Sequence, residues 1–206
     1  HYSGVLSDTK YLWRLPLLYK IMRKRVDFFA TVSPGYARKI ESRAGLKVDG
    51  ITYNPVNTDI FNLGDRVDRS SNVVNICTVG NWGFIKGGDI LLDALCKFPS
   101  DFKWRATLVG IFPNNVLDNI PQEVKKNIVI VNKRVKQEEL ATIYRESDIY
   151  VMSSRIETAN VSMLEAMACG CKVVCNINET SNTLLNEKIA TFYNKKSDLL
   201  ACAIVS

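Results

Sequence analysis

The sequence predicts a doubly wound α/β fold from about residue 70 onward, with a parallel sheet covered by helices on both faces. Short apolar runs rich in β-branched residues recur along the chain, which is typical of strands buried on both faces. Helix-like stretches lie between several of these runs. The expected strands are residues 73–79, 105–109, 127–131, 148–152, 172–176 and 190–193, and the expected helices are 88–98, 137–147, 161–169 and 181–188.

The first sixty residues are organised differently. Residues 27–33 predict a strand, 34–43 a helix and 50–56 another strand, and the polar stretch that follows carries turn signals. We place an incomplete N-terminal region at 1–60, a linker at 61–72 and the α/β domain at 73–206. Sixty residues are too few for a second complete domain of this kind, so we expect a fragment or a short version of a larger protein.

Composition narrows the class of protein. Hydrophobic residues make up 47% and charged residues 23% of the 206, as in ordinary globular proteins. No run of about 18 apolar residues predicts a transmembrane helix, and no basic-then-apolar leader opens the chain, so we expect a cytoplasmic location. The six cysteines form no CxxC pair, and the whole chain has one histidine that could join them as a ligand. They favour buried free thiols over a zinc site, and we expect no metal.

The formal charge of +6 is concentrated near the start of the chain, because residues 1–60 carry ten lysines or arginines against five acidic residues. In residues 11–25, apolar side chains stand beside cations. Peripheral contact with an anionic membrane surface is one interpretation. Packing of the leucines in a core is the other, which we favour slightly. No interleaved aromatic pattern accompanies the charge, so we expect no nucleic-acid partner.

A glycine-containing turn follows the first strand of the α/β domain. Gly80 ends that strand, while Gly83, Gly87 and Gly88 allow tight turning, and Lys86 adds a positive charge just before a helix. A helix N-terminus with a nearby ammonium suits a diphosphate. The turn matches neither a Walker A loop nor GxGxxG, so a turn that binds nothing is the alternative.

A second motif follows the fourth strand, 148–152. Glu157 lies in a loop and Glu165 in the second turn of a helix, giving the spacing E-x7-E. Such loops, at the carboxyl ends of parallel strands, are where these sheets bind ligands, and carboxylates accept hydrogen bonds from sugar and ribose hydroxyls. Two alternatives stay open: Ser162 and Glu165 fit a capping box, and Glu157 fits an exposed loop carboxylate.

The whole block, E-x7-E-A-M-A-x-G between two strands, resembles the retaining glycosyltransferases of family 4, the glycosyl transferases group 1. That family has the GT-B fold, in which two Rossmann-like domains face a cleft. The resemblance covers about residues 26–204 and implies a C-terminal, donor-binding domain preceded by the tail of an N-terminal, acceptor-side domain. The further matching segments are TVSPGYARKI, NPVNTDIF, VGNWGFIKGGDILLDAL and TLVG.

The resemblance also implies roles for the acidic and glycine-rich motifs. Glu165 would bind the ribose of the nucleotide, and Glu157 would contact the donor sugar on the face opposite the departing diphosphate. Lys86 would neutralise that diphosphate. Gly80 would let the backbone approach it, and Gly87 belongs to the same donor-binding loop.

Other positions match the family's donor site more loosely. Arg134 and Val135, after strand 127–131, would flank the base. His1 lies 32 positions before Ser33, where many relatives carry a catalytic-cleft histidine. A leftover of a purification tag or a fraying end is the alternative for His1. Backbone N–H groups would contact phosphate and sugar at Thr158, Ala159, Asn160 and Val161.

One departure from the family pattern concerns charge. Asn81 stands where relatives usually carry an arginine directly after the glycine of the first loop. Losing a charge-assisted contact of about 1.5–3 kcal/mol weakens binding roughly tenfold or more. Trp82, or a remote arginine such as Arg155, is the candidate for partial compensation.

The resemblance implies an enzyme that transfers a sugar from a nucleotide diphosphate sugar to an acceptor (glycan, lipid-linked or protein) with retention of configuration. It implies no cofactor and no metal, because lysine and backbone dipoles stabilise the leaving diphosphate. Two alternatives remain. One is a binding module without turnover, favoured by Asn81. The other is a nucleotide-sugar epimerase of the same fold, although such enzymes use histidines in both domains and this chain has one.

Overall fold

The computed structural model describes residues 21, 23–64, 72–178 and 181–206. The chain forms two compact units. The N-terminal unit comprises residues up to Asn54 together with Ile156–Ala159 and Asn178–Leu184. The sheet unit comprises Pro55–Arg155, Asn160–Ile177 and Leu185–Ser206.

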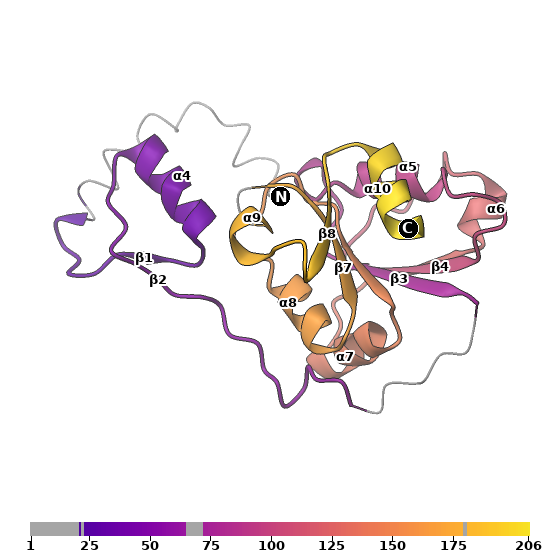
Figure 1. Ribbon diagram of the computed structural model, residues 1–206, viewed down its shortest axis with the longest axis horizontal. Coiled ribbons are helices and arrows are strands. Elements are labelled where there is room, and N and C mark those ends of the chain that lie inside the picture. The colour runs from indigo at the N-terminus through magenta and orange to yellow at the C-terminus, as the bar shows by residue number, and fades with distance from the viewer. Residues whose placement is uncertain (1–20, 22, 65–71, 179–180) are drawn as a thin grey trace. The chain divides into compact units, whose positions relative to one another are not determined.

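Six parallel strands form the sheet unit, in the order β5-β4-β3-β6-β7-β8 (Figure 1). The chain starts in the middle at β3, builds outward through β4 to β5, and returns to β6 on the other side of β3. The direction therefore reverses between β3 and β6, where such sheets open a crevice at their carboxyl edge. The strands are β3 (Val74–Val79), β4 (Trp104–Val109), β5 (Ile128–Val131), β6 (Ile149–Met152), β7 (Lys172–Asn176) and β8 (Ala190–Tyr193).

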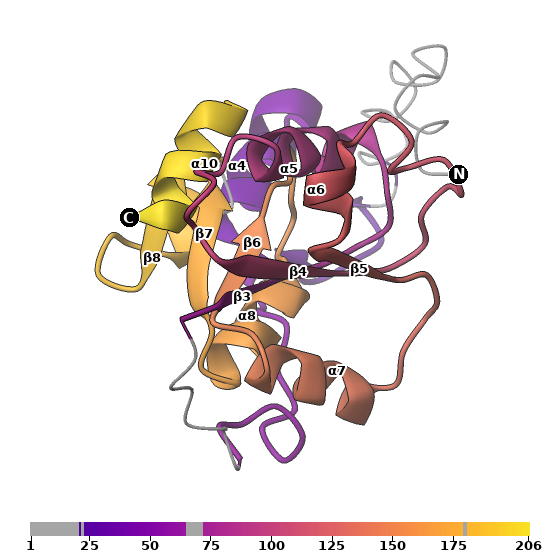
Figure 2. The same ribbon diagram turned by 90° about the vertical axis from the view of Figure 1, so that its right-hand side faces the viewer.

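Helices cover both faces of this sheet, which confirms the predicted fold class. Figure 2 shows α5 (Gly88–Leu95), α6 (Gln122–Lys125) and α10 (Ser197–Val205) over one face. It shows α7 (Gln137–Arg145) and α8 (Val161–Ala168) over the other.

Successive side chains of β6 point to opposite faces of the sheet and pack against different helices. Val151 is buried in the core that includes Leu91 of α5 and Leu200 of α10. Its neighbour Tyr150 faces the opposite layer, where its ring lies 6.0 Å from that of Tyr144 on α7. Both faces of the strand are buried, so the apolar run is continuous rather than alternating.

Short helices account for the differences from the expected elements. Helix α6 has four residues, too few to give a 3.6-residue pattern in the sequence. The stretch expected to be helical over 181–188 contains only α9 (Ser181–Leu184), because Asn186 forms a turn. Its side-chain oxygen accepts from Lys188 N at 2.9 Å, and its carbonyl accepts from Ile189 N at 3.1 Å.

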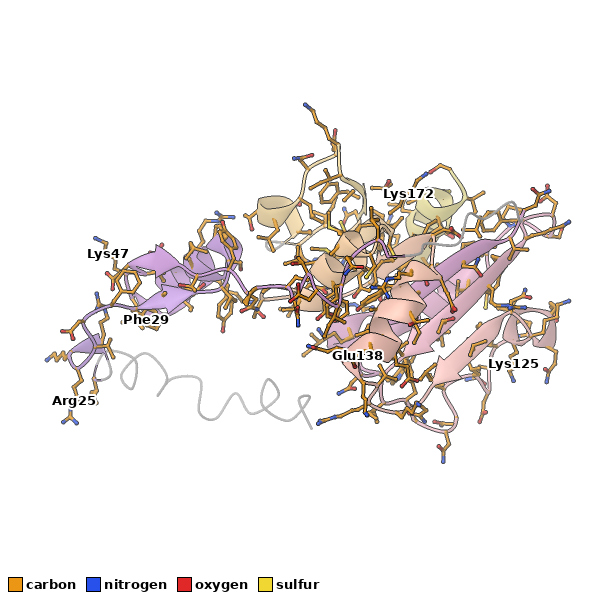
Figure 3. The ribbon with its side chains drawn as sticks, turned by 90° about the horizontal axis from the view of Figure 1, so that it is seen from below. Arg25, Phe29, Lys47, Lys125, Glu138 and Lys172 are labelled. Atoms are coloured by element: carbon orange, nitrogen blue, oxygen red, sulfur yellow. The ribbon has the colours of Figure 1, made fainter. Side chains whose placement is uncertain are left out.

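In the N-terminal unit, the predicted strand, helix and strand are present, with shorter strands. Strands β1 (Ala30–Thr31) and β2 (Gly50–Ile51) are parallel, and α4 (Pro34–Ala44) lies between them in the chain. Ser33 caps α4 by accepting from Tyr36 N. The exposed cations Arg25 and Lys47 extend from this unit (Figure 3).

Residues 55–64, which follow the N-terminal unit in the chain, are held by α7. Phe61 is buried, with its ring 6.1 Å from that of Tyr144. Arg145 Nη2 donates to the carbonyl of Ile60 at 2.6 Å and to Asn62 Oδ1 at 3.0 Å. The segment is therefore part of the sheet unit.

The cysteines are free thiols; four of them are buried as expected, whereas Cys96 is half-buried and Cys202 is exposed. Burial raises the pKa of Cys175 to about 12, so that thiol stays protonated at neutral pH. In the part of the chain that the structure describes, no three His, Cys, Asp or Glu residues are grouped so that they could hold a metal ion. Nor does that part contain a helix with the length and apolarity needed to span a membrane.

Candidate functional site

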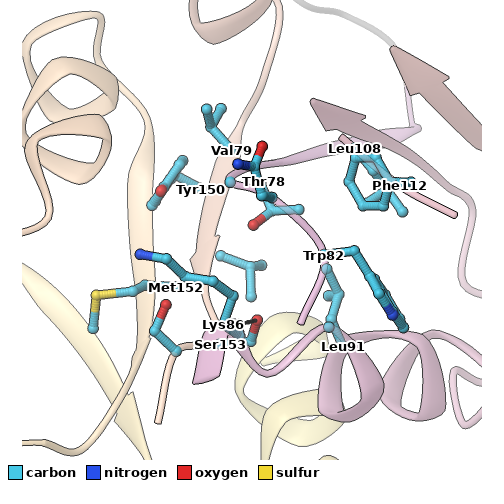
Figure 4. A pocket seen from close by; sticks show the side chains of 15 residues that line it. Thr78, Val79, Trp82, Lys86, Leu91, Leu108, Phe112, Tyr150, Met152 and Ser153 are labelled. Carbon is cyan, nitrogen blue, oxygen red and sulfur yellow. Dashed lines mark hydrogen bonds between the residues drawn. The ribbon is translucent and has the colours of Figure 1, made fainter. Parts of the chain in front are cut away.

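A pocket opens at the reversal point of the sheet, between the carboxyl ends of β3 and β6 (Figure 4). The space that the centre of a water molecule can occupy in it measures about 30 Å³, enough for about one or two waters, and the whole hollow with its open mouth reaches about 420 Å³. The pocket is thus the inner end of an open site. It is lined by Thr78, Val79, Gly80, Asn81, Trp82, Lys86, Gly88, Leu91, Leu108, Phe112, Tyr150, Val151, Met152, Ser153 and Ser154.

Gly80 and Lys86 meet in this pocket. Gly80 ends β3, and its N–H donates to the carbonyl of Val109 at 2.9 Å. A Cβ atom on Gly80 would have one neighbour, Lys86 Cδ at 3.9 Å. The Lys86 side chain points into the pocket in Figure 4. The structure therefore brings together the two residues expected to face a diphosphate.

Gly87 lets the turn before α5 approach the end of β6. Its φ of 66° is left-handed, and a Cβ there would lie 2.0 Å from the carbonyl oxygen of Ser153. Ser153 Oγ also donates to the carbonyl of Lys86 at 2.9 Å. The glycine is needed both for its conformation and for the absence of a side chain.

Asn81 and Trp82 hold the loop that follows β4. Asn81 Oδ1 accepts from Ile111 N at 3.2 Å, and Trp82 N donates to the carbonyl of Ile111 at 2.9 Å. The indole of Trp82 packs 6.1 Å from the ring of Phe112 and lies against Gly88, where a Cβ would come within 2.3 Å of it. Trp82 thus covers the start of α5 and narrows the pocket.

Arg155 does not contribute a free charge to the pocket. Its two terminal nitrogens donate to Asp89 at 2.7 and 2.6 Å, so its charge is offset by a carboxylate. Among the residues that line the pocket, Lys86 is the one cation. Sequence reasoning could not have found the pairing with Asp89, because 66 positions separate the two residues.

Helix α8 begins at Val161, and its N-cap is Asn160. Asn160 adopts a left-handed conformation with φ 42°, and its Oδ1 accepts from Met163 N at 3.0 Å. The alternative in which Ser162 caps the helix is therefore wrong, because Ser162 lies inside the first turn. Tyr150 also donates to Asn160 Oδ1, at 3.5 Å, so the cap is linked to β6.

Glu165 lies in the second turn of α8 and is half-buried. Tyr144, which is fully buried, donates its hydroxyl to Glu165 Oε2 at 3.4 Å. Burial raises the pKa of Glu165, and the Tyr144 hydrogen bond opposes that rise. Sequence reasoning missed Tyr144; the available signal was a tyrosine on the apolar face of a helix, whose hydroxyl needs a buried partner.

The loop residues before Asn160 group with the N-terminal unit. The carbonyl of Thr158 accepts from Ser33 Oγ at 2.5 Å, Ala159 is buried, and Glu157 is partly exposed. Val161 is the first residue of α8 in the sheet unit.

The positions expected at the base lie outside the pocket. Arg134 is exposed and Val135 half-buried in the loop after β5, at the carboxyl edge of the sheet. Sequence reasoning missed Asn132 in this region. Its side chain accepts from Phe112 N at 2.8 Å and donates to the carbonyl of Phe112 at 3.0 Å. His1 and most of residues 11–25, namely 11–20 and 22, lie outside the described residues.

Comparisons with known proteins find a family model, a relative and solved structures that are similar to this chain. The family model for glycosyl transferases group 1 matches residues 73–205. An uncharacterized 41.2 kDa protein in the cps region of Klebsiella pneumoniae is 27% identical over 186 residues, which is 85% of this chain and 50% of that protein. The chain thus spans about half the length of this curated relative.

Solved structures share the fold at low identity. A sucrose-phosphate synthase from Thermosynechococcus elongatus superposes with a TM-score of 0.77 at 19% identity, over 92% of this chain and 51% of that one. A glycosyltransferase from Rickettsia africae gives 0.73 at 20% identity, over 86% and 52%. HepE from Anabaena, solved with UDP and glucose, gives 0.68 at 18% identity, over 87% and 53%.

Proposed function

The chain belongs to the glycosyl transferases group 1 family, and on that premise we propose that it carries the donor-binding half of a glycosyltransferase. The whole protein would transfer a sugar from a nucleotide diphosphate sugar to an acceptor, with retention of configuration and without a metal. The observation that carries the proposal is the pairing of Gly80 with Lys86 in a pocket where the sheet reverses.

A diphosphate leaving group needs positive potential that is in place before the bond breaks. Lys86 supplies an ammonium on a turn held by Ser153. The N-terminus of α5 follows directly at Gly88, and helix starts carry partial positive charge. These groups support metal-free departure of the diphosphate.

We assign to Glu165 the role of binding the nucleoside. Its carboxylate is half-buried and keeps one oxygen beyond the Tyr144 hydrogen bond for ribose hydroxyls. The assignments of Glu157 and His1 to the sugar, and of Arg134 and Val135 to the base, rest on the family resemblance and stay predictions. UDP-glucose is the first donor to test, because HepE from Anabaena was solved with it.

A donor-binding module without turnover is the second candidate. Asn81 favours it, because its side-chain oxygen is used to hold Ile111 and it brings no charge to the diphosphate. The two candidates share the binding step and differ in whether the donor is consumed.

Thermal unfolding in the presence of nucleoside diphosphates tests the binding step. UDP, GDP and ADP, each with one sugar conjugate, are compared at millimolar concentration. A ligand at ten times its Kd stabilises by about 1.4 kcal/mol, so even weak binding registers. We expect one base to raise the unfolding temperature, and Lys86→Ala to abolish most of that rise.

Lys103→Ala is the matched control, because Lys103 is an exposed lysine just before β4, at the opposite edge of the sheet. It should leave the shift unchanged. No shift with any diphosphate, or equal loss in both variants, would contradict the proposed donor site.

Product analysis separates the enzyme from the module. The donor that stabilises the chain is incubated with the whole protein, with and without excess EDTA, and free sugar and diphosphate are quantified. Consumption that survives EDTA supports a metal-free transferase. Binding without consumption supports the module, and consumption lost in EDTA overturns metal independence.

A further inference from the structure

The turn that carries Lys86, residues 84–87, is held by the segment that follows β6. Ser153 Oγ donates to the carbonyl of Lys86 at 2.9 Å. Arg155 N donates to the carbonyl of Ile85 at 2.8 Å, and Arg155 Nη1 donates to that of Phe84 at 2.6 Å. The guanidinium also lies 4.0 Å from the centre of the Phe84 ring. Every residue of the 3-10 turn Phe84–Lys86 thus has a contact with the 153–155 segment.

Arg155 has a second partner at the start of α5. Its two terminal nitrogens meet the two oxygens of Asp89 in a bidentate pair, at 2.7 and 2.6 Å. Asp89 lies in the first turn of α5, next to Gly88 of the pocket lining. A carboxylate at that point would repel a diphosphate, and the guanidinium offsets its charge.

We propose that Arg155 is a positioning residue of the donor site, which fixes the Lys86 turn and offsets the Asp89 carboxylate so that a diphosphate can bind. The inference rests on the proposed function, because it assumes that the pocket takes the diphosphate of a nucleotide. Arg155 does not touch the ligand; it acts through Lys86 and Asp89.

The Arg155 side chain is 20% exposed and that of Asp89 is 53% exposed. A bidentate arginine–carboxylate pair of this kind can add to stability as well as to ligand binding, so the test has to separate the two roles. The pair determines where the one lining cation stands and how much negative charge faces the pocket. Both quantities matter to a diphosphate more than to a nucleoside.

The test measures binding by titration calorimetry, with UDP, GDP and ADP and the matching monophosphates as probes. Arg155→Ala should weaken diphosphate binding about tenfold and monophosphate binding clearly less. Asp89→Asn placed in the Arg155→Ala protein should recover part of the loss, because the uncompensated carboxylate is gone. Lys97→Ala, which breaks exposed ion pairs beyond the other end of α5, should leave every affinity unchanged.

A merely structural role would behave differently in a double-mutant comparison. If Arg155 acts through Lys86, Arg155→Ala should add much less than its usual loss when Lys86 is already alanine. Equal losses for diphosphates and monophosphates, with full additivity to Lys86→Ala, would overturn the positioning role. So would wild-type affinity in Arg155→Ala. Failure of the wild type to bind any diphosphate would overturn the proposed function, and the positioning role with it.

Discussion

Gly87 is the position in the donor turn where a side chain cannot be accommodated. Its left-handed backbone costs a non-glycine residue about 1–2 kcal/mol. A Cβ would also lie 2.0 Å from the Ser153 carbonyl, so the backbone would have to move. We predict that Gly87→Ala lowers the free energy of unfolding by more than about 2 kcal/mol, measured by urea titration.

Gly83 provides the control in the same turn. Its φ of 164° is extended backbone, and a Cβ there would meet nothing within 4 Å. Gly83→Ala should change the free energy of unfolding by no more than about 0.5 kcal/mol. Similar losses in both variants would show that the approach to Ser153 is not what constrains Gly87.

Glu165 should make stability depend on pH. Burial raises its folded-state pKa above the ordinary value of 4.5, so the fold favours the neutral carboxyl. The contribution of Glu165 to stability is therefore fully present below the pKa that it has in the unfolded chain. It is lost as the pH rises through the pKa that it has in the folded chain. We predict that wild-type stability, measured relative to Glu165→Gln, falls as the pH rises from about 4 to 7.

Urea titrations of the two proteins at matched pH values measure that difference directly. Groups common to both proteins cancel in the comparison. A difference that is constant with pH, or that grows in favour of the wild type as the pH rises, would contradict a raised pKa for Glu165.

At the scale of elements, α10 covers one face of the sheet, and only one side of this helix packs into the core. Leu200 is fully buried in the core that includes Leu91 of α5, whereas its neighbour Leu199 is 45% exposed. Leu200→Ala should cost about 2–5 kcal/mol of unfolding free energy, because it leaves a cavity. Leu199→Ala should stay within about 0.5 kcal/mol. Equal costs in urea titration would place α10 outside the core.

The start of α8 depends on Asn160 in two ways, through its side-chain cap and its left-handed backbone. Asn160→Ala loses both and should cost about 1–2 kcal/mol or more of unfolding free energy. Asn160→Gly keeps the backbone free to turn and should cost only a few tenths of a kcal/mol. Thermal unfolding of the two variants measures the contrast. An equal cost would mean that the left-handed conformation is not required.

Much of the element pattern could be predicted because the sheet is buried on both faces. Each strand of the sheet unit lies within or close to an apolar run that the sequence displays. Helix α6, of four residues, could not be predicted, because one turn leaves no periodic pattern, and the helix expected over 181–188 is present only as α9. The prediction that Ser162 caps the helix was wrong for another reason. The motif fits, but Asn160, in a left-handed conformation, is the cap directly before the helix.

At the scale of the whole molecule, the order of the strands assembles the candidate site. The segments after β3 and β6 lie some seventy positions apart in the chain, yet they meet because the sheet reverses between those strands. Parallel strands made it predictable that their loops share one edge. The contacts that tune the site could not be read from the sequence, since Asn81 with Ile111, Arg155 with Asp89 and Tyr144 with Glu165 are all tertiary.

The most direct test of the donor site is a crystal structure of the chain with the nucleoside diphosphate that stabilises it most. We predict the diphosphate beside Gly80 and the Lys86 ammonium, at the reversal between β3 and β6, with ribose hydroxyls within hydrogen-bond distance of Glu165. A diphosphate bound elsewhere, or a nucleotide in the pocket with its ribose away from Glu165, would contradict the account.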